Sequence, residues 1–149
     1  MKNIIAVIGG RRIEKALLAE AEEVGRLIGK SGAILVCGGL GGVMEAASKG
    51  AQSEGGLTVG ILPQDNSERA NQYIDIPIAT GLGICRNVII ARTVDALIAV
   101  GGEYGTLSEI AFALQLKKPV VGIKTWGIKG VISSENAADA MNKVSELLK

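Results

Sequence analysis

A chain of 149 residues, 48% of them hydrophobic, is long enough to bury one full core, so we expect a single domain over residues 1–149. Its net charge of +1, with no more than two basic residues in a row, argues against nucleic acid as a partner. No apolar run reaches the ~20 residues that a membrane span requires, and the amino terminus lacks the pattern of a signal peptide. We therefore expect a cytoplasmic protein that does not bind membranes.

Apolar strands alternate with helical patterns along the chain. The first half predicts, in order, a strand at residues 3–8, a helix from residue 13 that ends at Gly32, a strand at residues 33–36, a helix at residues 41–53 and a strand at residues 57–62. Residues 64–82 form an irregular excursion, whose pattern is compatible with a short strand around residues 74–78. The remainder predicts a helix at residues 84–93, a strand at 96–100, a helix at 106–116, a strand at 119–123 and a helix at 135–148.

This alternation, with strands that read as continuous apolar runs, predicts a parallel sheet covered on both faces. The expected fold class is α/β, a Rossmann-like doubly wound parallel sheet in three α/β/α layers. In such sheets ligands bind at the carboxyl ends of the strands, near the point where the strand order reverses.

Two glycine-rich loops each follow a predicted strand and lead directly into a predicted helix. The first contains Gly38, Gly39, Gly41 and Gly42; the second contains Gly102, Gly105 and Thr106. A strand that turns through glycines into a helix leaves unpaired N–H groups at the positive end of the helix dipole, which suits a phosphate. The pair of loops therefore predicts a phosphorylated ligand that bridges them. The glycines of the first loop also have a simpler explanation, a tight turn with close helix packing.

Two familiar motifs do not fit. The dinucleotide fingerprint would need a glycine where Met44 stands, and the first loop follows the second strand rather than the first. Residues 25–31 resemble a phosphate-binding P-loop, but Val24 occupies the position of its first glycine. The sequence has no histidine, which removes the common nucleophile pairs and the commonest zinc ligand. Cys37 and Cys85 are expected to be buried thiols, and no metal or cofactor is predicted.

Three segments resemble one superfamily, that of the Lonely Guy phosphoribohydrolases and the molybdenum cofactor carrier proteins. They are GGLGGVMEAA at residues 38–47, TVGILP at residues 58–63 and DALIAVGGEYGTLSE at residues 95–109. The likeness runs from about residue 4 to residue 126, and within the superfamily the chain is most similar to small bacterial and archaeal proteins grouped with the cofactor carriers. The resemblance implies a phosphorylated ligand and a homo-oligomer.

The resemblance also implies site residues. The final Glu of the Lonely Guy Gly-Gly-x-Gly-Thr-x-x-Glu loop is catalytic and corresponds to Glu109; the catalytic Arg corresponds to Arg86. Glu109 would stabilise the oxocarbenium-like state of N-glycosidic hydrolysis, and Arg86 would hold the phosphate or Glu109 itself. Thr106 and the amides of Gly102, Gly105 and Thr106 would grip the phosphate. On position alone, Glu109 and Thr106 could instead be a dipole partner and an N-cap.

The chain also departs from the Lonely Guy pattern. Its second loop is one residue longer, with Glu103 and Tyr104 between the glycine pair and Gly105, and Gly101 replaces a proline. Residues 84–87 read ICRN where the family has MHERK, so a lysine is missing. Tyr104 is interpreted either as a stacking partner for a base or as a packed side chain. Three further arginines, Arg11, Arg12 and Arg92, are interpreted as solvated, and Glu45 is equally compatible with a dipole partner and a ligand contact.

Two hypotheses follow for function. In the first, the protein is an enzyme that releases the free base from a nucleoside 5′-monophosphate; Arg86 and Glu109 favour it. In the second, it is a non-catalytic carrier of molybdenum cofactor or of a related phosphorylated pterin or nucleotide; the longer loop, the missing lysine and the overall likeness favour it. The predicted helices at residues 84–93 and 106–116 are apolar on nearly every side, which predicts a homo-oligomer, a dimer or a tetramer, with these helices at its interface.

Overall fold

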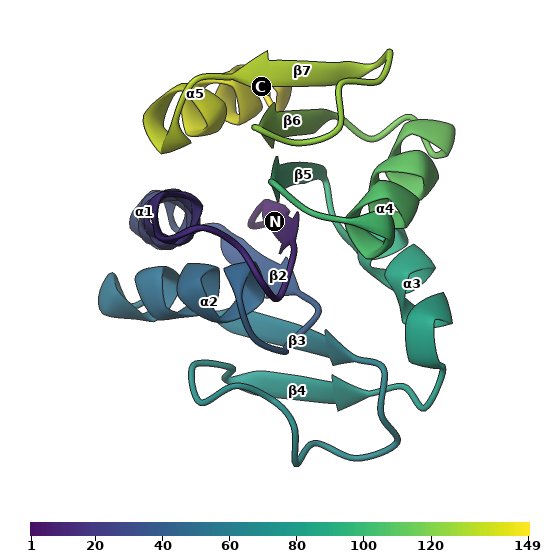
Figure 1. Ribbon diagram of the computed structural model, residues 1–149. Helices are drawn as coiled ribbons and strands as arrows, with labels where there is room; N and C mark the ends of the chain where they lie inside the picture. Colours follow the sequence, from purple (N-terminus) through teal and green to yellow (C-terminus); the bar gives the residue numbers. More distant parts are fainter.

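The computed structural model describes all 149 residues and contains one seven-stranded parallel sheet (Figure 1). The strands are β1 (Ile4–Gly9), β2 (Ile34–Cys37), β3 (Thr58–Leu62), β4 (Ile76–Ala79), β5 (Ala96–Val100), β6 (Val120–Ile123) and β7 (Val131–Ser134). Their order across the sheet is β4-β3-β2-β1-β5-β6-β7, and every neighbouring pair is parallel. The order reverses between β1 and β5, which makes the carboxyl ends of these two strands the expected place for a ligand.

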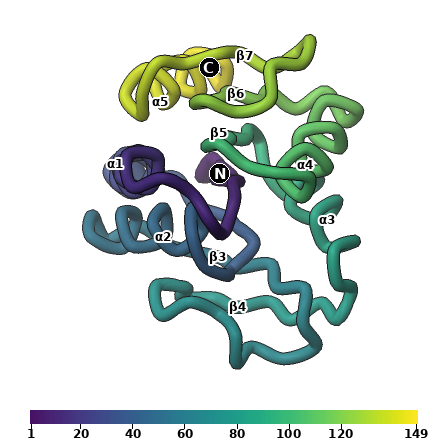
Figure 2. The backbone as a smooth tube through the Cα atoms, viewed as in Figure 1, coloured from purple at the N-terminus to yellow at the C-terminus, as the bar shows by residue number.

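Helices cover both faces of the sheet, as Figures 1 and 2 show. The helices are α1 (Lys15–Ser31), α2 (Val43–Ser53), α3 (Arg86–Thr93), α4 (Tyr104–Gln115) and α5 (Ala137–Leu147), with a single 3-10 turn, η1 (Gly83–Cys85), before α3. On one face α1, α2 and α5 pack over the larger core cluster; on the other, α3 and α4 pack over the smaller one. The three-layer α/β/α Rossmann-like fold predicted from the sequence is confirmed. No helix is long and apolar enough to cross a membrane.

The strands reach both layers because successive side chains point to opposite faces. In β1, Ile5 and Val7 belong to the larger cluster, whereas Ala6 and Ile8 belong to the smaller one. All five residues of β5 are buried, so both faces of the strand must be apolar. This two-sided burial is the physical reason that the central strands appear in the sequence as unbroken apolar runs.

Helices α1 and α2 touch backbone to backbone. A Cβ atom at Gly25 would lie 1.9 Å from the carbonyl oxygen of Ala47, and one at Gly50 would lie 1.9 Å from the carbonyl oxygen of Glu22. Neither distance is compatible with any side chain, so both positions require glycine despite its cost inside a helix. This contact fixes the spacing between the two helices.

The structure differs from the expected elements in a few places. β7 was not predicted, because Val131–Ser134 is a half-exposed edge strand with two serines and no apolar run. The short strand of the excursion lies at Ile76–Ala79, and the helix expected from residue 84 begins as η1 and becomes α-helical only at Arg86. Cys37 is buried and unpaired as expected, whereas Cys85 is unpaired but exposed, which corrects the expectation that both are buried.

Candidate functional site

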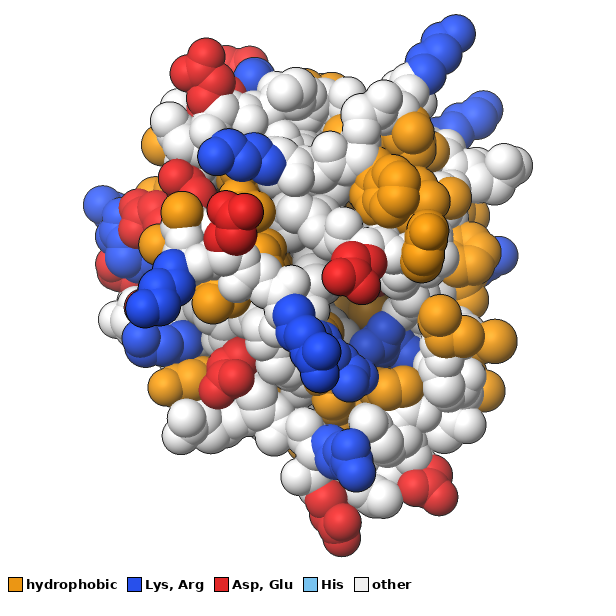
Figure 3. Space-filling view, in the orientation of Figure 1, with side chains coloured by type: hydrophobic (Ala, Val, Ile, Leu, Met, Phe, Trp, Pro, Cys, Tyr) orange, Lys and Arg blue, Asp and Glu red, His pale blue; other side chains and the backbone are white.

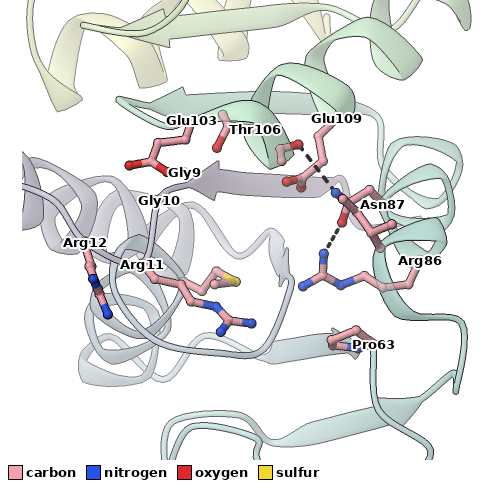
Figure 4. Close-up of a pocket in the computed structure, with 13 residues that line it drawn as sticks. Gly9, Gly10, Arg11, Arg12, Pro63, Arg86, Asn87, Glu103, Thr106 and Glu109 are labelled. Carbon is pink, nitrogen blue, oxygen red and sulfur yellow. Dashed lines mark hydrogen bonds between the residues drawn. The ribbon is translucent and has the colours of Figure 1, made fainter.

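A cavity of about 550 Å³ lies at the carboxyl ends of β1 and β5, where the strand order reverses. Its lining comprises Gly9, Gly10, Arg11, Arg12, Met44, Pro63, Ile84, Arg86, Asn87, Glu103, Gly105, Thr106 and Glu109 (Figure 4). The volume falls in the range of roughly 300–1,000 Å³ typical of small-molecule sites. Most of the lining is polar, charged or glycine, which suits a charged ligand better than an apolar one.

One wall of the cavity is the amino-terminal turn of α4. The chain leaves β5 through Gly101 and Gly102, both at positive φ, and enters the helix at Tyr104. The amides of Tyr104, Gly105 and Thr106 lie in the first turn, where no carbonyl precedes them in the helix, and they donate to no other part of the chain. With the positive end of the helix dipole behind them, these amides have the chemistry that suits an anion.

Two side-chain features keep this turn open to a ligand. Apart from the chain neighbours and the backbone of its own helix, no atom lies within 4 Å of where a Cβ at Gly105 would stand, so there is open space beside this residue of the lining. Thr106 is 3% exposed, its hydroxyl has no partner in the chain, and its side chain packs on the Cα of Gly102. Gly102 itself does not line the cavity. It holds Thr106 in place, because any side chain at residue 102 would displace the threonine.

Arg86 is held on the opposite wall by hydrogen bonds to neutral acceptors. Its Nε donates to the carbonyl of Ile61 at 2.8 Å, one terminal nitrogen donates to the side-chain oxygen of Asn87, and the other donates to the carbonyl of Gly38 at 3.4 Å. Three of its five N–H groups are therefore used and two remain for a ligand. Burial lowers the pKa of Arg86, and the nearby Glu109 partly opposes that effect.

Glu109 lies in the second turn of α4 and is only 7% exposed. Burial raises the pKa of its carboxyl to about 8, an effect that the charge of Arg86 only partly offsets. No ion pair joins Glu109 to Arg86, so the alternative in which the arginine holds the glutamate directly is not what the structure shows. At pH 7 a carboxyl with this pKa is mostly protonated.

Asn87 links the two walls, a role that the sequence reasoning missed. Its side-chain oxygen accepts from Arg86, and its Nδ2 donates to the hydroxyl of Ser108 at 3.1 Å and to the carbonyl of Gly105 at 3.4 Å. The Ser108 hydroxyl also donates to the Gly105 carbonyl, at 2.6 Å. In the sequence, Asn87 could have been found only from its place directly after Arg86, at the start of a helix.

Arg11 and Arg12 also line the cavity, although the sequence reasoning interpreted them as solvated. Both are exposed and follow β1, and neither forms an ion pair or a side-chain hydrogen bond within the chain. In Figure 4 Arg11 extends across the cavity toward the side of Arg86 and Pro63, whereas Arg12 points away from its middle. Figure 3 shows basic side chains gathered beside a hollow at the centre of this face.

The first glycine-rich loop lies behind the cavity rather than in its lining. Its glycines, Gly38, Gly39, Gly41 and Gly42, are all absent from the lining, and Gly42 borders a separate shallow pocket between α1 and α2, together with Glu45. A Cβ at Gly42, which has φ +66°, would lie 2.4 Å from the carbonyl oxygen of Gly10. The close packing that the sequence left open as an alternative is therefore present, and contact between this loop and a ligand stays a prediction.

Tyr104 stacks against Trp126 beside the α4 turn, with ring centroids 6.1 Å apart. The indole N–H of Trp126 donates to the carbonyl of Glu103 at 3.1 Å, which ties the longer second loop to the segment after β6. The tyrosine ring is thus packed on one side and exposed on the other. Glu103 stands at the rim of the cavity, as Figure 4 shows.

Comparison with known proteins agrees with the fold and the motifs. The SLOG cluster4 family model matches residues 2–148. An uncharacterized protein from Archaeoglobus fulgidus is 48% identical over 139 residues, which are 93% of this chain and 91% of the relative. The cytokinin riboside 5′-monophosphate phosphoribohydrolase of Mycobacterium tuberculosis is 36% identical over 121 residues, which are 74% of this chain and 64% of that protein.

Two solved structures are similar over the whole chain. The molybdenum cofactor binding protein of the phototrophic bacterium Rippkaea orientalis has a TM-score of 0.95 and 34% identity, covering 100% of this chain and 99% of that one. The molybdenum cofactor carrier protein of Chlamydomonas reinhardtii has a TM-score of 0.90 and 38% identity, covering 99% of both chains. On the family match and the 48% identical relative, the chain belongs to the SLOG cluster4 family.

Proposed function

We propose that this protein is a non-catalytic carrier that binds molybdenum cofactor or a related phosphorylated pterin or nucleotide in the cavity at the β1 and β5 ends. The observation that carries the proposal is the full-length similarity to two proteins described as binding or carrying molybdenum cofactor. The cavity supports it, because most of its lining residues are charged, polar or glycine, and its basic side chains suit a charged small molecule.

The phosphate of this ligand would lie at the amino-terminal turn of α4. The free amides of Gly105 and Thr106 and the unpartnered Thr106 hydroxyl would donate hydrogen bonds to its oxygens, and the helix dipole favours its charge. Both residues were assigned to phosphate binding from the sequence. Gly102 would act indirectly, by seating Thr106.

A test compares phosphorylated with unphosphorylated ligands. We expect a nucleoside monophosphate or a phosphorylated pterin to raise the melting temperature, whereas the matching nucleoside or unphosphorylated pterin does not. A ligand present at 100 times its dissociation constant adds about 2.7 kcal/mol of stability, which a thermal shift assay detects. Equal shifts with both forms of a ligand would contradict the phosphate site.

A second candidate function is hydrolysis of the N-glycosidic bond of a nucleoside 5′-monophosphate. It is favoured by the presence of Arg86 and Glu109 in one cavity and by the similarity to a phosphoribohydrolase. Against it, a carboxyl with a pKa of about 8 carries little negative charge at pH 7 to stabilise a ribosyl cation. The carrier proposal is therefore the better supported one.

Base release separates the two functions. Incubation with a panel of nucleoside monophosphates, followed by chromatography, yields free base only if the protein is an enzyme. In that case Glu109→Gln would abolish release and leave ligand binding nearly unchanged, because the lost charge is needed only in the transition state. Demonstrated binding without base release from any monophosphate supports the carrier.

We also propose that the protein forms a homo-oligomer through the face that α3 and α4 cover. Two helices cover this face, against three on the other, and apolar side chains remain exposed along it, among them Ile76 and Ile78 on β4, Ile84 in η1 and Phe112 on α4. Exposed apolar side chains of this size on neighbouring elements are typical of an interface. Light scattering at micromolar concentration should show a mass above 15.4 kDa, and a monomer alone would contradict the proposal.

A further inference from the structure

No ion pair joins the positive charges in the cavity to an acidic side chain, although Glu103 and Glu109 also line it. The ion pairs of the structure join Arg26 to glutamates, Lys49 to a glutamate and Lys143 to an aspartate, all outside this cavity. Arg86 bonds only to neutral acceptors, and Arg11 bonds to none. Since Glu109 is mostly protonated at pH 7, it compensates little of this charge.

The two guanidinium groups also face one another. Arg11 extends from the loop after β1 toward the side of the cavity where Arg86 is anchored (Figure 4). Burial lowers the pKa of Arg86 most, and the positive charge of Arg11 lowers it further, which places the two groups within electrostatic range. Like charges that face across a cavity without a counter-ion favour a bound anion between them.

This position is distinct from the phosphate site at α4. The phosphate site is made of backbone amides and one hydroxyl from a single helix turn, whereas Arg11 and Arg86 come from the β1–α1 loop and from α3. The cavity of about 550 Å³ has room for more than one phosphate-sized group. A single phosphate at α4 would leave the positive charges of Arg11 and Arg86 without a bound anion.

We infer that the cavity selects a ligand with two separate acidic groups, a phosphate at the amino-terminal turn of α4 and a second anionic group between Arg11 and Arg86. The inference rests on the proposed phosphate site and adds the class of ligand. Arg86 is held by three hydrogen bonds and is pre-oriented, whereas Arg11 is unbonded and free to close on the second group. Arg11 is thus a residue that determines specificity.

The test measures the affinity of matched adenine ligands by calorimetry. Adenosine, AMP, ADP and adenosine 3′,5′-bisphosphate differ in the number and spacing of their phosphates. We expect the wild-type protein to bind at least one of the two doubly phosphorylated ligands about tenfold more tightly than AMP, since hydrogen bonds to charged groups contribute about that factor. Arg11→Ala should remove this advantage and leave the affinity for AMP within about twofold, and Arg11→Lys should restore part of it.

Arg92→Ala is the matched control, because it removes an exposed arginine that does not line the cavity. If Arg11→Ala lowers the affinity for AMP and for the doubly phosphorylated ligands equally, or if the control has the same effect, the inference is wrong. The positive charge would then attract every anionic ligand without forming a second site. If the wild-type protein binds all three phosphorylated ligands equally but not adenosine, the inference alone fails and the phosphate site stands. Equal binding of adenosine and AMP would contradict the proposed function itself.

Discussion

The two glycine-rich loops look alike in the sequence and differ in the structure. Both turn from a strand of the sheet into a helix, yet the loop before α2 packs against the β1–α1 loop, where the amide of Val43 donates to the carbonyl of Gly10 at 3.1 Å. The loop before α4 faces the cavity, and the amides of Gly105 and Thr106 stay free. Whether such a loop can bind an anion therefore depends on what covers it, and the covering segment is distant in the sequence.

The largest expected effect is that of Gly42→Val in the covered loop. A side chain there would collide with the backbone of Gly10 and Arg11, at 2.4 and 2.5 Å, and valine would be forced to a positive φ. We expect the free energy of unfolding to fall by about 3 kcal/mol or more, as measured by urea denaturation. A variant as stable as the wild type would show that the contact between the two loops is not tight.

Protonation of Glu109 should make stability depend on pH. Because the folded-state pKa of about 8 lies above the ordinary value of 4.5 for a glutamate, the folded protein binds the proton more tightly than the unfolded chain. The stabilisation is therefore complete below pH 4.5 and is lost as the pH rises from about 4.5 to 8, by about 1.4 kcal/mol for each pH unit in this range.

Denaturation curves across this pH range measure the effect. Glu109→Gln should remove the loss of stability at rising pH. Glu45→Gln is the matched control at the start of α2, after the other loop, and should retain this loss. An unchanged pH dependence in Glu109→Gln would mean that this carboxyl ionises normally.

Gly105→Val should separate binding from folding in the open loop. Apart from the chain neighbours and the backbone of α4 itself, no atom lies within 4 Å of the new Cβ, so the free energy of unfolding should change by less than about 1 kcal/mol. The side chain would point into the cavity and block the approach of a phosphate to the α4 amides. We expect at least a tenfold loss of affinity for a phosphorylated ligand, equivalent to about 1.4 kcal/mol, in calorimetry. Full retention of affinity would place the phosphate elsewhere.

Asn87→Ala should have a smaller, mixed effect. It removes the acceptor for Arg86 and the donor to Ser108 and Gly105. The start of α4 therefore loses its side-chain hydrogen bonds to α3. We expect about 1–2 kcal/mol lower stability by urea denaturation and a severalfold weaker affinity for a phosphorylated ligand. Loss of stability with unchanged affinity would make Asn87 purely structural.

The sequence predicted the fold well because the fold depends on local patterns. Two-sided burial makes a central strand such as β5 an unbroken apolar run, and the alternation with helices then restricts the topology to a parallel sheet. β7 escaped prediction because an edge strand that is half exposed carries no such run. Arg86 and the second glycine loop, which the sequence assigned to one site, both line the cavity.

The rest of the cavity depends on contacts that no local pattern records. In the sequence nothing distinguishes Arg11 from other exposed arginines. Its role depends on the β1–α1 loop facing α3 across the cavity. Asn87 becomes significant only through its bonds to Arg86 and α4. The pKa of Glu109 depends on its burial, which its position in the sequence did not reveal.

The backbone contact between α1 and α2 has a consequence for the site, although it lies outside the lining. Each of these helices follows a loop described above: α1 follows the loop that carries Arg11 and Arg12, and α2 follows the first glycine-rich loop, behind the cavity. Gly25 and Gly50 leave no gap between the helices. The helix spacing that they allow therefore sets the distance between the two loops. Alanine, the strongest helix former, would be a poor replacement at either position, since the added methyl group would spread the helices and carry Arg11 away from Arg86.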